Sequence, residues 1–516
     1  MSTLNAADVI LAKAREPEFR DRPAILHAGG AVTYGELDAA ASRAANALLG
    51  FGLARGDRVC FLMKDSPLFC AAYLGAMRAG LVALALNSRL SPAEQAFVVT
   101  DSAARLLVAD PDFMEAARAA HGAAPLVCSR GADDSFERAL TRASPDFATV
   151  ATDATDEAFW LYSSGTTGNP KGILHSHANA AHAGKLLREV LRADERTVVL
   201  GTSKLFFAFG LDNAFMGVLS CGATTILNEG WPEPDAIVEQ VLRYRPNVFL
   251  AVPSFFRRLL ALPPERLAAM KSVPINLTGG ERLPEAVEAQ WRASVETEIL
   301  VLHGMSETFC NTFCNFPGRS RSGTCGNALA GVETRLLDLG GQPVDAGEPG
   351  VLWVRHPSLA LRYRSEEATA RLFRDGWFCT GDLFTVDGDG YWTHQGRADE
   401  LIKVAGQWVK PMELEEAVLR DARIREAACV VIPDSDGFDR LALFVVGHAL
   451  APGEAARIAE SRLASLPKYS RPKWIHEVAD LPRTATGKVQ RFRLRESVLA
   501  GIGPLIEPAG GSASRA

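Results

Sequence analysis

The chain has 516 residues, 47% hydrophobic and 22% charged, which is the balance of a globular protein rather than a disordered or fibrous one. Its net charge of −6 and pI near 6.0 exclude a general positive field that would attract nucleic acid or an anionic membrane. Nine scattered cysteines without paired CxxC spacing and an N-terminus without an apolar signal segment predict a soluble cytoplasmic protein. We expect a monomer or homodimer with no nucleic-acid or membrane partner.

Helical and apolar runs alternate through the first 330 residues. Thr33 followed by Glu36 is a capping-box pattern, which predicts a helix that ends near Gly50. The apolar stretch 69–86 is broken by Arg78 and Gly80, so it predicts a buried helix and a strand rather than a membrane span. Strands are expected at 59–63, 81–86, 106–108, 159–162, 198–201, 224–227, 248–252, 275–278 and 299–302. This alternation predicts an α/β fold with doubly wound, mostly parallel sheets.

After about residue 330 the pattern changes to short strands with turns such as 387–390, which predicts a β-rich subregion. Past Arg397 a new α+β pattern begins, with helices at 411–420 and 454–464 and strands at 429–432 and 441–446. We therefore expect a large N-terminal domain over residues 1–397, a hinge at 398–400, a small mobile α+β C-terminal domain over 401–506 and a flexible tail at 507–516.

The segment 162–172 follows an apolar strand and combines hydroxyl side chains, three glycines and a lysine. Glycines let backbone N–H groups approach an anion, hydroxyls add donors and the lysine adds charge, so the segment predicts a phosphate-binding loop. Because Lys171 is followed by Gly172, the loop is not a Walker A motif. A flexible surface linker is the alternative, which the buried strand before the loop disfavours. The candidate phosphate ligands are Ser163, Ser164, Gly165, Thr166, Thr167, Gly168 and Lys171.

This loop resembles that of the adenylate-forming superfamily of acyl-CoA synthetases, peptide-synthetase adenylation domains and luciferases, and the resemblance extends over nearly the whole chain. It implies an enzyme whose loop wraps the β- and γ-phosphates of ATP. It further implies that ATP and Mg²⁺ activate a carboxylic acid as an acyl-AMP with release of pyrophosphate, and that the acyl group then passes to a thiol. A non-catalytic nucleotide sensor is the rival from another class.

Three further segments resemble parts of the same superfamily site. In segment 303–307, Ser306 is expected to hold the α-phosphate and Glu307 the magnesium ion, since hard cations prefer oxygen ligands. Ser306 replaces the usual threonine, and His303, expected near adenine, replaces the usual aromatic residue or aspartate. The small-residue turn of Gly279, Gly280 and Glu281 is expected to carry adenine, and Asp382 with Arg397 to bind the ribose hydroxyls.

The C-terminal part carries two more such segments. The resemblance makes Asp399 the hinge pivot and assigns Lys403 and Gly406 to cofactor binding, with Gly406 opening a narrow passage for the thiol. Lys488 matches the catalytic lysine that bridges the acid carboxylate and the α-phosphate, two anions that repel each other until a fixed cation lies between them. The alternative for Lys488 is a basic solvated face, because arginines crowd the segment. The presence of Lys488 weighs against a non-catalytic nucleotide sensor, which could dispense with this lysine.

The segments 160–165 and 204–214 resemble the benzoate–CoA ligase branch. The corresponding pocket positions are Ala208, Phe209, Gly304, Phe309, Cys310 and Asn311. Aromatic core packing is the alternative for this set. The resemblance implies benzoate or a substituted aromatic acid. Phe209 and Cys310 stand where that branch has tyrosine and histidine, which removes two polar groups and leaves a bulkier, substituted or non-aromatic acid open. Coenzyme A is the expected acceptor, and the alternative is an acyl-AMP ligase that loads a separate carrier protein.

Overall fold

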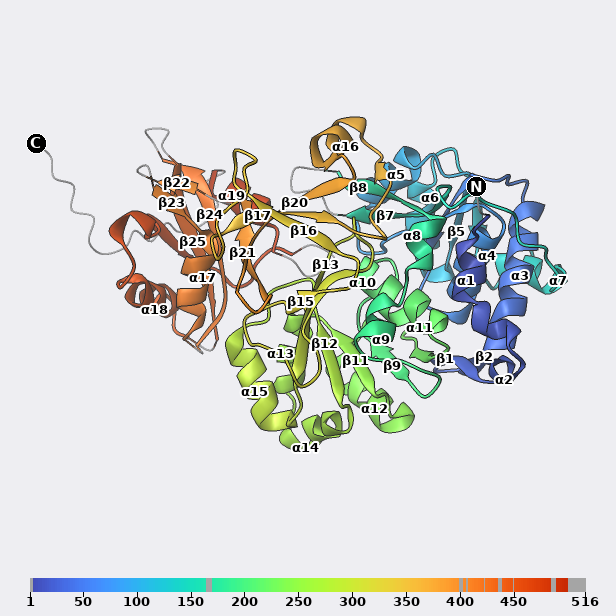
Figure 1. Cartoon of the computed structure of the whole chain (residues 1–516), viewed down its shortest axis with the longest axis horizontal. Coiled ribbons are helices and arrows are strands. Elements are labelled where there is room, and N and C mark those ends of the chain that lie inside the picture. The colour runs from blue at the N-terminus through green and yellow to red at the C-terminus, as the bar shows by residue number, and fades with distance from the viewer. Residues whose placement is uncertain are drawn as a thin grey trace, which may run out of the picture.

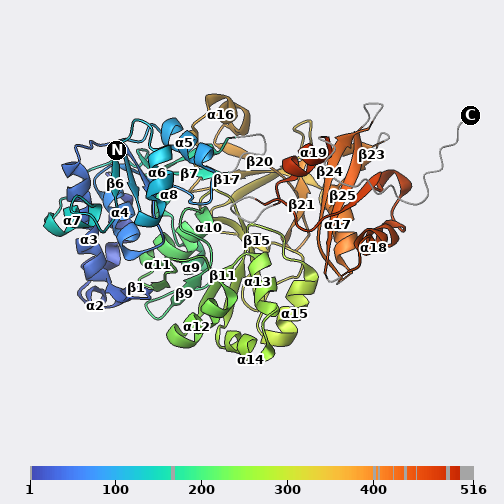
Figure 2. The same cartoon turned by 180° about the vertical axis from the view of Figure 1, so that it is seen from behind.

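The computed structural model describes residues 3–163, 169–398, 402–404, 407–421, 423–434, 439–448, 450–483 and 489–499. Figures 1 and 2 show three sheets wrapped by helices in the N-terminal four-fifths of the chain and a smaller C-terminal sheet with its own helices at one end of the molecule. Within the described ranges, no helix combines the length and apolar character needed to cross a bilayer.

The first sheet has seven strands. Their order is β18 (Arg362–Tyr363), β8 (Lys171–Ser176), β7 (Glu157–Ser163), β4 (Val82–Ala85), β3 (Arg58–Leu62), β5 (Leu106–Ala109) and β6 (Leu126–Cys128). Strands β7 to β6 are parallel neighbours, whereas β8 and β18 add antiparallel to the β7 edge. The sheet is therefore a parallel α/β layer whose edge is closed by a hairpin.

The second sheet has nine strands. Their order is β15 (Asn327–Ala328), β14 (Asn311–Cys314), β13 (Ile299–Gly304), β12 (Ile275–Thr278), β11 (Val248–Ala251), β9 (Val198–Gly201), β10 (Thr224–Ile226), β1 (Pro23–His27) and β2 (Gly30–Thr33). From β13 to β1 all neighbours are parallel. Parallel pairing sets the carboxyl ends of β12 and β13 side by side, and ligands gather at such ends.

Helices cover both large sheets and the space between them. They are α1 (Ala6–Ile10), α2 (Pro17–Arg20), α3 (Tyr34–Gly50), α4 (Pro67–Arg78), α5 (Pro92–Asp101), α6 (Met114–Ala120), α7 (Phe136–Arg142), α8 (His177–Ala181), α9 (Lys185–Glu189), α10 (Ala208–Leu211), η3 (Asp212–Met216), α11 (Gly217–Ser220), α12 (Pro234–Tyr244), α13 (Pro253–Leu260), α14 (Pro264–Leu267) and α15 (Glu285–Val295). The capping box predicted at Thr33 and Glu36 is confirmed at the start of α3.

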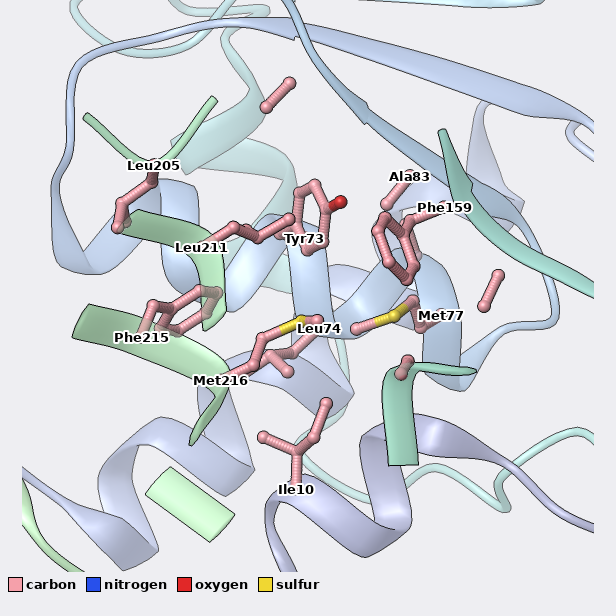
Figure 3. Close-up of a cluster of buried hydrophobic side chains, with 14 of the residues drawn as sticks. Ile10, Tyr73, Leu74, Met77, Ala83, Phe159, Leu205, Leu211, Phe215 and Met216 are labelled. Atoms are coloured by element: carbon pink, nitrogen blue, oxygen red, sulfur yellow. The ribbon is translucent and has the colours of Figure 1, made fainter. Parts of the chain in front are cut away.

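The main core lies where α4 meets the stretch from α10 to α11, which runs through η3, a turn of π-helix. Figure 3 shows Tyr73 of α4 with Leu205, Leu211 and Phe215 in one cluster, and Tyr73 and Phe215 are fully buried. Each large apolar side chain buried in such a cluster stabilises the fold by roughly 1.5–3 kcal/mol. The segment that carries two of the expected pocket residues, Ala208 and Phe209, is thus fixed on a packed core.

The β-rich subregion expected after residue 330 is present as a third sheet. It is built from β16 (Glu333–Leu337), β17 (Gly350–Arg355), β19 (Phe373–Arg374), β20 (Trp377–Val386) and β21 (Trp392–Arg397), with α16 (Glu366–Leu372) beside it. The turn at residues 387–390 joins β20 to β21, so that Asp382 pairs with Arg397 in register. This register brings together the two residues that the sequence assigned to ribose.

The C-terminal domain is the small α+β unit that the sequence predicted. It holds β22 (Ile402–Val404), β23 (Gln407–Val409), β24 (Ile424–Pro433), β25 (Asp439–Gly447), β26 (Trp474–Glu477), α17 (Pro411–Leu419), α18 (Glu454–Leu463) and α19 (Arg491–Leu499). Its own apolar clusters form around β24 and β25. Arg282 forms an ion pair with Glu416 of α17, and Arg257 Nη1 donates to the Arg425 carbonyl oxygen at 2.6 Å. Both contacts join the C-terminal domain to the larger N-terminal part.

Candidate active site

The phosphate loop connects two antiparallel strands. Ser163 ends β7 and Lys171 begins β8, and the two residues lie opposite each other in the ladder. Both are half-buried. A P-loop instead joins a strand to a helix, so this hairpin agrees with the sequence argument against a Walker A motif. The other expected phosphate ligands, Ser164, Gly165, Thr166, Thr167 and Gly168, lie outside the described residues.

Strand β8 is joined to the Ser306–Glu307 segment at two points. His175 Nε2 of β8 donates to the Ser306 carbonyl oxygen at 2.9 Å. Tyr363 of β18, which pairs with β8, donates its hydroxyl to Glu307 Oε1 at 2.7 Å. Burial and the nearby Glu307 carboxylate raise the pKa of Tyr363 above its usual value, so the phenol stays a donor. The loop strand and the carboxylate expected to bind magnesium are therefore held together.

The surroundings of Glu307 suit a magnesium ion that also binds phosphates. The Glu307 carbonyl oxygen accepts from Ala360 N at 2.8 Å, so the backbone is fixed, and the side chain is half-buried rather than sealed. In the described part of the chain, no cluster of three or more acidic, histidine or cysteine side chains could hold a metal alone. Magnesium commonly binds one or two carboxylates together with substrate phosphates and water, which fits a single glutamate.

The expected adenine turn lies at the end of β12, next to β13. A Cβ at Gly279 would lie 2.5 Å from Leu302 Cδ1, so the backbone approaches β13 as closely as only glycine allows. Gly280 has a φ of +85°, in the left-handed region that favours glycine. Gly280 is exposed and Glu281 is half-buried. The turn thus combines a tightly packed glycine with an exposed one at the end of β12.

The expected ribose carboxylate, Asp382, lies among three basic side chains. Arg397 Nη1 is 3.2 Å and His394 Nε2 is 3.5 Å from Asp382 Oδ1. Burial opposes the charge of Asp382, but the hydrogen bond from His394 and the positive charge of Arg397 outweigh it and hold the pKa of Asp382 well below its usual range. His303 also acts on Asp382 electrostatically, and its ring is 5.0 Å from the ring of Phe384. Asp382 is thus an ionised acceptor.

The expected pocket residues come together from two parts of the chain. Asn311 Nδ2 donates to Asn213 Oδ1 at 2.8 Å, and Asn213 Nδ2 donates to the Phe209 carbonyl oxygen at 3.1 Å. A Cβ at Gly304 would lie 3.1 Å from Asn311 Oδ1, so Gly304 borders the same group. The half-buried Ala208 precedes Phe209 on α10.

Two members of this set lie deeper. The Phe309 ring packs 4.8 Å from the Phe159 ring and is 3% exposed, as the alternative of core packing described. Its φ of 57° is uncommon for a bulky residue, and such strain occurs more often at functional sites. Cys310 is buried, and its thiol donates to the His182 carbonyl oxygen at 3.4 Å.

The remaining expected residues are only partly placed. Lys403 lies on β22, while Asp399, Gly406 and Lys488 lie outside the described residues. Tyr363, His394 and Asn213 were missed by the sequence reasoning. Pairing 382 with 397 across the predicted turn at 387–390 could have indicated His394, because it lies three residues before Arg397. No local pattern points to Tyr363, whose strand has two residues.

Comparison with known proteins supports this arrangement. Residues 13–364 match the model of the AMP-binding enzyme family, and residues 413–488 match that of the AMP-binding enzyme C-terminal domain. The chain is 40% identical to the 3-hydroxybenzoate–CoA ligase of Aromatoleum sp. (strain CIB), covering 96% of this chain and 98% of that protein. It is 38% identical to the 3-hydroxybenzoate–CoA/4-hydroxybenzoate–CoA ligase of Thauera aromatica, covering 97% and 98%.

A solved structure agrees over the same length. The crystal structure of the anthranilate CoA ligase AuaEII in complex with anthranoyl-AMP superposes with a TM-score of 0.89 and 29% identity, covering 97% of this chain and 98% of that one. The fold, the composite site and the family-model matches along both domains lead to one conclusion: the chain belongs to the AMP-binding enzyme family.

Proposed function

We propose that this protein is an AMP-forming carboxylate–CoA ligase for an aromatic acid. It uses ATP and Mg²⁺ to convert the acid to an acyl-AMP with release of pyrophosphate, and then transfers the acyl group to coenzyme A. The observation that carries the proposal is the linkage of β8, which follows the phosphate loop, to the Ser306–Glu307 segment through His175 and Tyr363. The nearby ionised Asp382 supplies the acceptor that ribose hydroxyls require.

In the first step the protein chiefly supplies position and charge. Lys171 and the hydroxyls of the loop bind the outer phosphates, and the Ser306 hydroxyl donates to the α-phosphate. Glu307 would hold magnesium, which neutralises phosphate charge when bound. Lys488 lies between the acid carboxylate and the α-phosphate, so that it stabilises the negative charge that builds on the phosphorus oxygens.

For the second step we assign a rotation of the small domain about Asp399, which withdraws Lys488 and brings Gly406 to the thiol passage. In this assignment residues 401–506 move relative to residues 1–397. ATP and coenzyme A are both available in the cytoplasm, and buried free thiols such as Cys60 and Cys70 suit that compartment. We place the reaction there.

The acid is assigned to the aromatic class on two grounds. The residues at the expected pocket are flanked by aromatic and small side chains from α10 and β14. The two relatives described above are named for hydroxybenzoates. A flat apolar ring with its carboxylate toward Ser306 suits such a surrounding.

A coupled pyrophosphate assay over benzoate, hydroxy-, amino- and methylbenzoates, cyclic acids and short fatty acids tests the assignment. We expect release only with Mg·ATP and fastest release with aromatic acids. AMP release that rises with added coenzyme A identifies coenzyme A as the acceptor, whereas indifference to it favours a carrier protein. Calorimetry that finds no binding of Mg·ATP with any acid overturns the proposal.

A variant of Lys488 tests whether this lysine acts in acyl-AMP formation and not in thioester formation. We expect Lys488→Ala to slow pyrophosphate release about 100-fold or more, because one fixed cation is lost from the developing charge. Thioester formation from supplied acyl-AMP should persist. Lys468→Ala, which removes an exposed lysine of the same domain, is the matched control and should leave both steps intact. Equal loss of both steps in Lys488→Ala contradicts the assignment.

A further inference from the structure

Asp212 is a buried carboxylate directly behind the expected acid pocket. Its side chain is 0% exposed, and it is the first residue of the π-helical turn η3. It lies four residues after Ala208, and positions four apart on a helix fall on the same face. Asp212 therefore continues the face of the helix that carries a pocket residue. Turns of π-helix inside α-helices occur often at functional sites.

One oxygen of Asp212 has a structural role and the other has none. Oδ1 accepts from Gly184 N at 2.8 Å. Gly184 has a φ of +79° and lies tightly against Gly217, so this bond fixes a close crossing of two segments. Among the described residues, no hydrogen bond of normal geometry reaches Oδ2. The Cys310 thiol is a weak donor beside the carboxylate, and Arg188 acts on it through its charge. Leaving a buried polar atom unsatisfied costs about 1–3 kcal/mol, so Oδ2 requires an explanation.

The neighbour of Asp212 on the pocket side is Cys310. The two side chains interact, since the Asp212 carboxylate contributes to raising the pKa of the Cys310 thiol after burial, which is the larger cause. The thiol has a single weak donor, which it shares between the His182 carbonyl oxygen at 3.4 Å and the Asp212 carboxylate. Asp212 thus borders two expected pocket residues, Ala208 through the helix and Cys310 through contact, with an acceptor left over.

We propose that Asp212 determines the specificity of the acid pocket by accepting, at Oδ2, a hydrogen bond from a donor substituent on the aromatic ring. The substrate class is a benzoate that carries a hydroxyl or an amino group. This inference rests on the proposed function and adds the ring substituent to it. A substrate donor would give this oxygen a strong hydrogen bond, whereas an unsubstituted or methylated ring would leave it buried with at most the weak thiol donor.

The carboxylate is also suited to this role electrostatically. Burial raises the pKa of Asp212 to about 6, so that at neutral pH most of the population is ionised and accepts rather than donates. Hydrogen bonds to charged groups contribute about 1.5–3 kcal/mol, which corresponds to roughly a 10- to 100-fold preference. None of the six expected pocket residues carries a charged side chain, so Asp212 brings the charge to this group.

The test measures the full-length protein with acids that differ only in one ring substituent. For the wild type, at least one hydroxybenzoate isomer should exceed the methylbenzoate of the same substitution pattern by about 10- to 100-fold in kcat/KM for pyrophosphate release. The methyl group fills similar space without a donor. The corresponding aminobenzoate should also exceed the methylbenzoate.

Two variants separate recognition from folding. Asp212→Ala should lower the hydroxy-to-methyl ratio at least about 10-fold. Asp212→Asn keeps an oxygen for Gly184 N and presents an amide N–H₂ at the other position, so it should lose the aminobenzoate more than the hydroxybenzoate, whose oxygen can accept. Asp110→Asn alters a buried aspartate at the end of β5 and should leave the hydroxy-to-methyl and the amino-to-methyl ratios unchanged. Thermal unfolding of each variant checks its fold.

Each outcome decides the question. Changed ratios in the two Asp212 variants support the inference. A wild type that treats hydroxy- and methylbenzoates alike, or variants that lower every acid by one factor, overturn it while leaving the ligase assignment intact. The second result would mean that Asp212 serves only Gly184 and that a water satisfies Oδ2. If the wild type activates no acid, the proposed function fails first and the inference with it.

Discussion

Tyr363 donates to the same carboxylate that we assign to magnesium. Replacing it by phenylalanine removes one hydroxyl and leaves Glu307 free to rotate away from β18. We expect Tyr363→Phe to raise the Mg²⁺ concentration that gives half-maximal pyrophosphate release by about 10-fold or more, since a hydrogen bond to a charged acceptor contributes about 1.5–3 kcal/mol. A magnesium titration at saturating ATP measures it.

Tyr73→Phe is the matched control. The Tyr73 hydroxyl is buried in the core and has no partner among the described residues, so its removal breaks no hydrogen bond. It should leave the magnesium titration unchanged. If both variants shift the titration alike, the effect comes from the core and not from Glu307.

Asp382 gives a second prediction about a single residue. Asp382→Asn removes the charge that Arg397 and His394 stabilise, and it turns one acceptor into a donor that faces the ribose hydroxyls. We expect the KM for ATP to rise about 10- to 100-fold. Asp387→Asn changes an exposed aspartate in the turn of the same hairpin and should not alter this KM. An unchanged KM in Asp382→Asn would remove Asp382 from the nucleotide site.

Among the elements, the turn after β12 depends on the absence of a side chain. Gly279→Ala places a methyl group 2.5 Å from Leu302 Cδ1 on β13, so one strand end must shift. We expect the free energy of unfolding to fall by about 1–3 kcal/mol, as in other overpacked cores. Gly388→Ala, where a Cβ meets nothing within 4 Å, is the control for denaturant unfolding. Equal stability of the two variants contradicts the close approach.

The sequence predicted the elements that repeat a pattern and missed those that depend on tertiary contact. All nine expected strands of the two large sheets are present, because buried parallel strands have continuous apolar runs that sequence reveals. Strands β8 and β18 were not predicted. β8 begins with Lys171 and Gly172, and β18 has two residues that are held by pairing with β8 and by tertiary contacts such as the Tyr363–Glu307 hydrogen bond.

The candidate site divides in the same way. Ser306, Glu307, Asp382 and Arg397 lie in motifs of adjacent residues and could be named from the sequence, and the structure pairs Asp382 with Arg397. Their assigned roles stay predictions. Tyr363 and Asp212 act across long separations, and their importance depends on which atom they face, so no local pattern reveals them. The roles assigned to Lys488 and Asp399 stay predictions.

For the whole molecule, buried histidines link stability to pH. Burial lowers the pKa of His175, His177 and His356 to about 4, so between pH 4 and 6.5 the unfolded chain binds protons that the folded chain does not. Each histidine should therefore lower the free energy of unfolding by up to about 1.4 kcal/mol per pH unit as the pH falls through this range. Asp212, whose pKa burial raises to about 6, acts in the opposite direction and offsets only part of the loss.

Denaturant unfolding at pH 7 and pH 5 measures this dependence. The protein should be clearly less stable at pH 5, and His356→Gln should show a smaller difference between the two pH values. Equal stability of the wild type at both values would mean that these histidines take up protons in the folded state.

The candidate nucleotide site is assembled from segments that begin at Ser163 and end at Arg397. A ribosome that adds ~5–20 residues per second needs on the order of 10 to 50 seconds to make that stretch. During this interval the nascent chain has the strand that we assign to phosphate binding but lacks the carboxylate and the arginine that we assign to ribose binding. ATP therefore cannot guide early folding, and the emerging N-terminal part must rely on its own packing or on chaperones until β21 has left the exit tunnel.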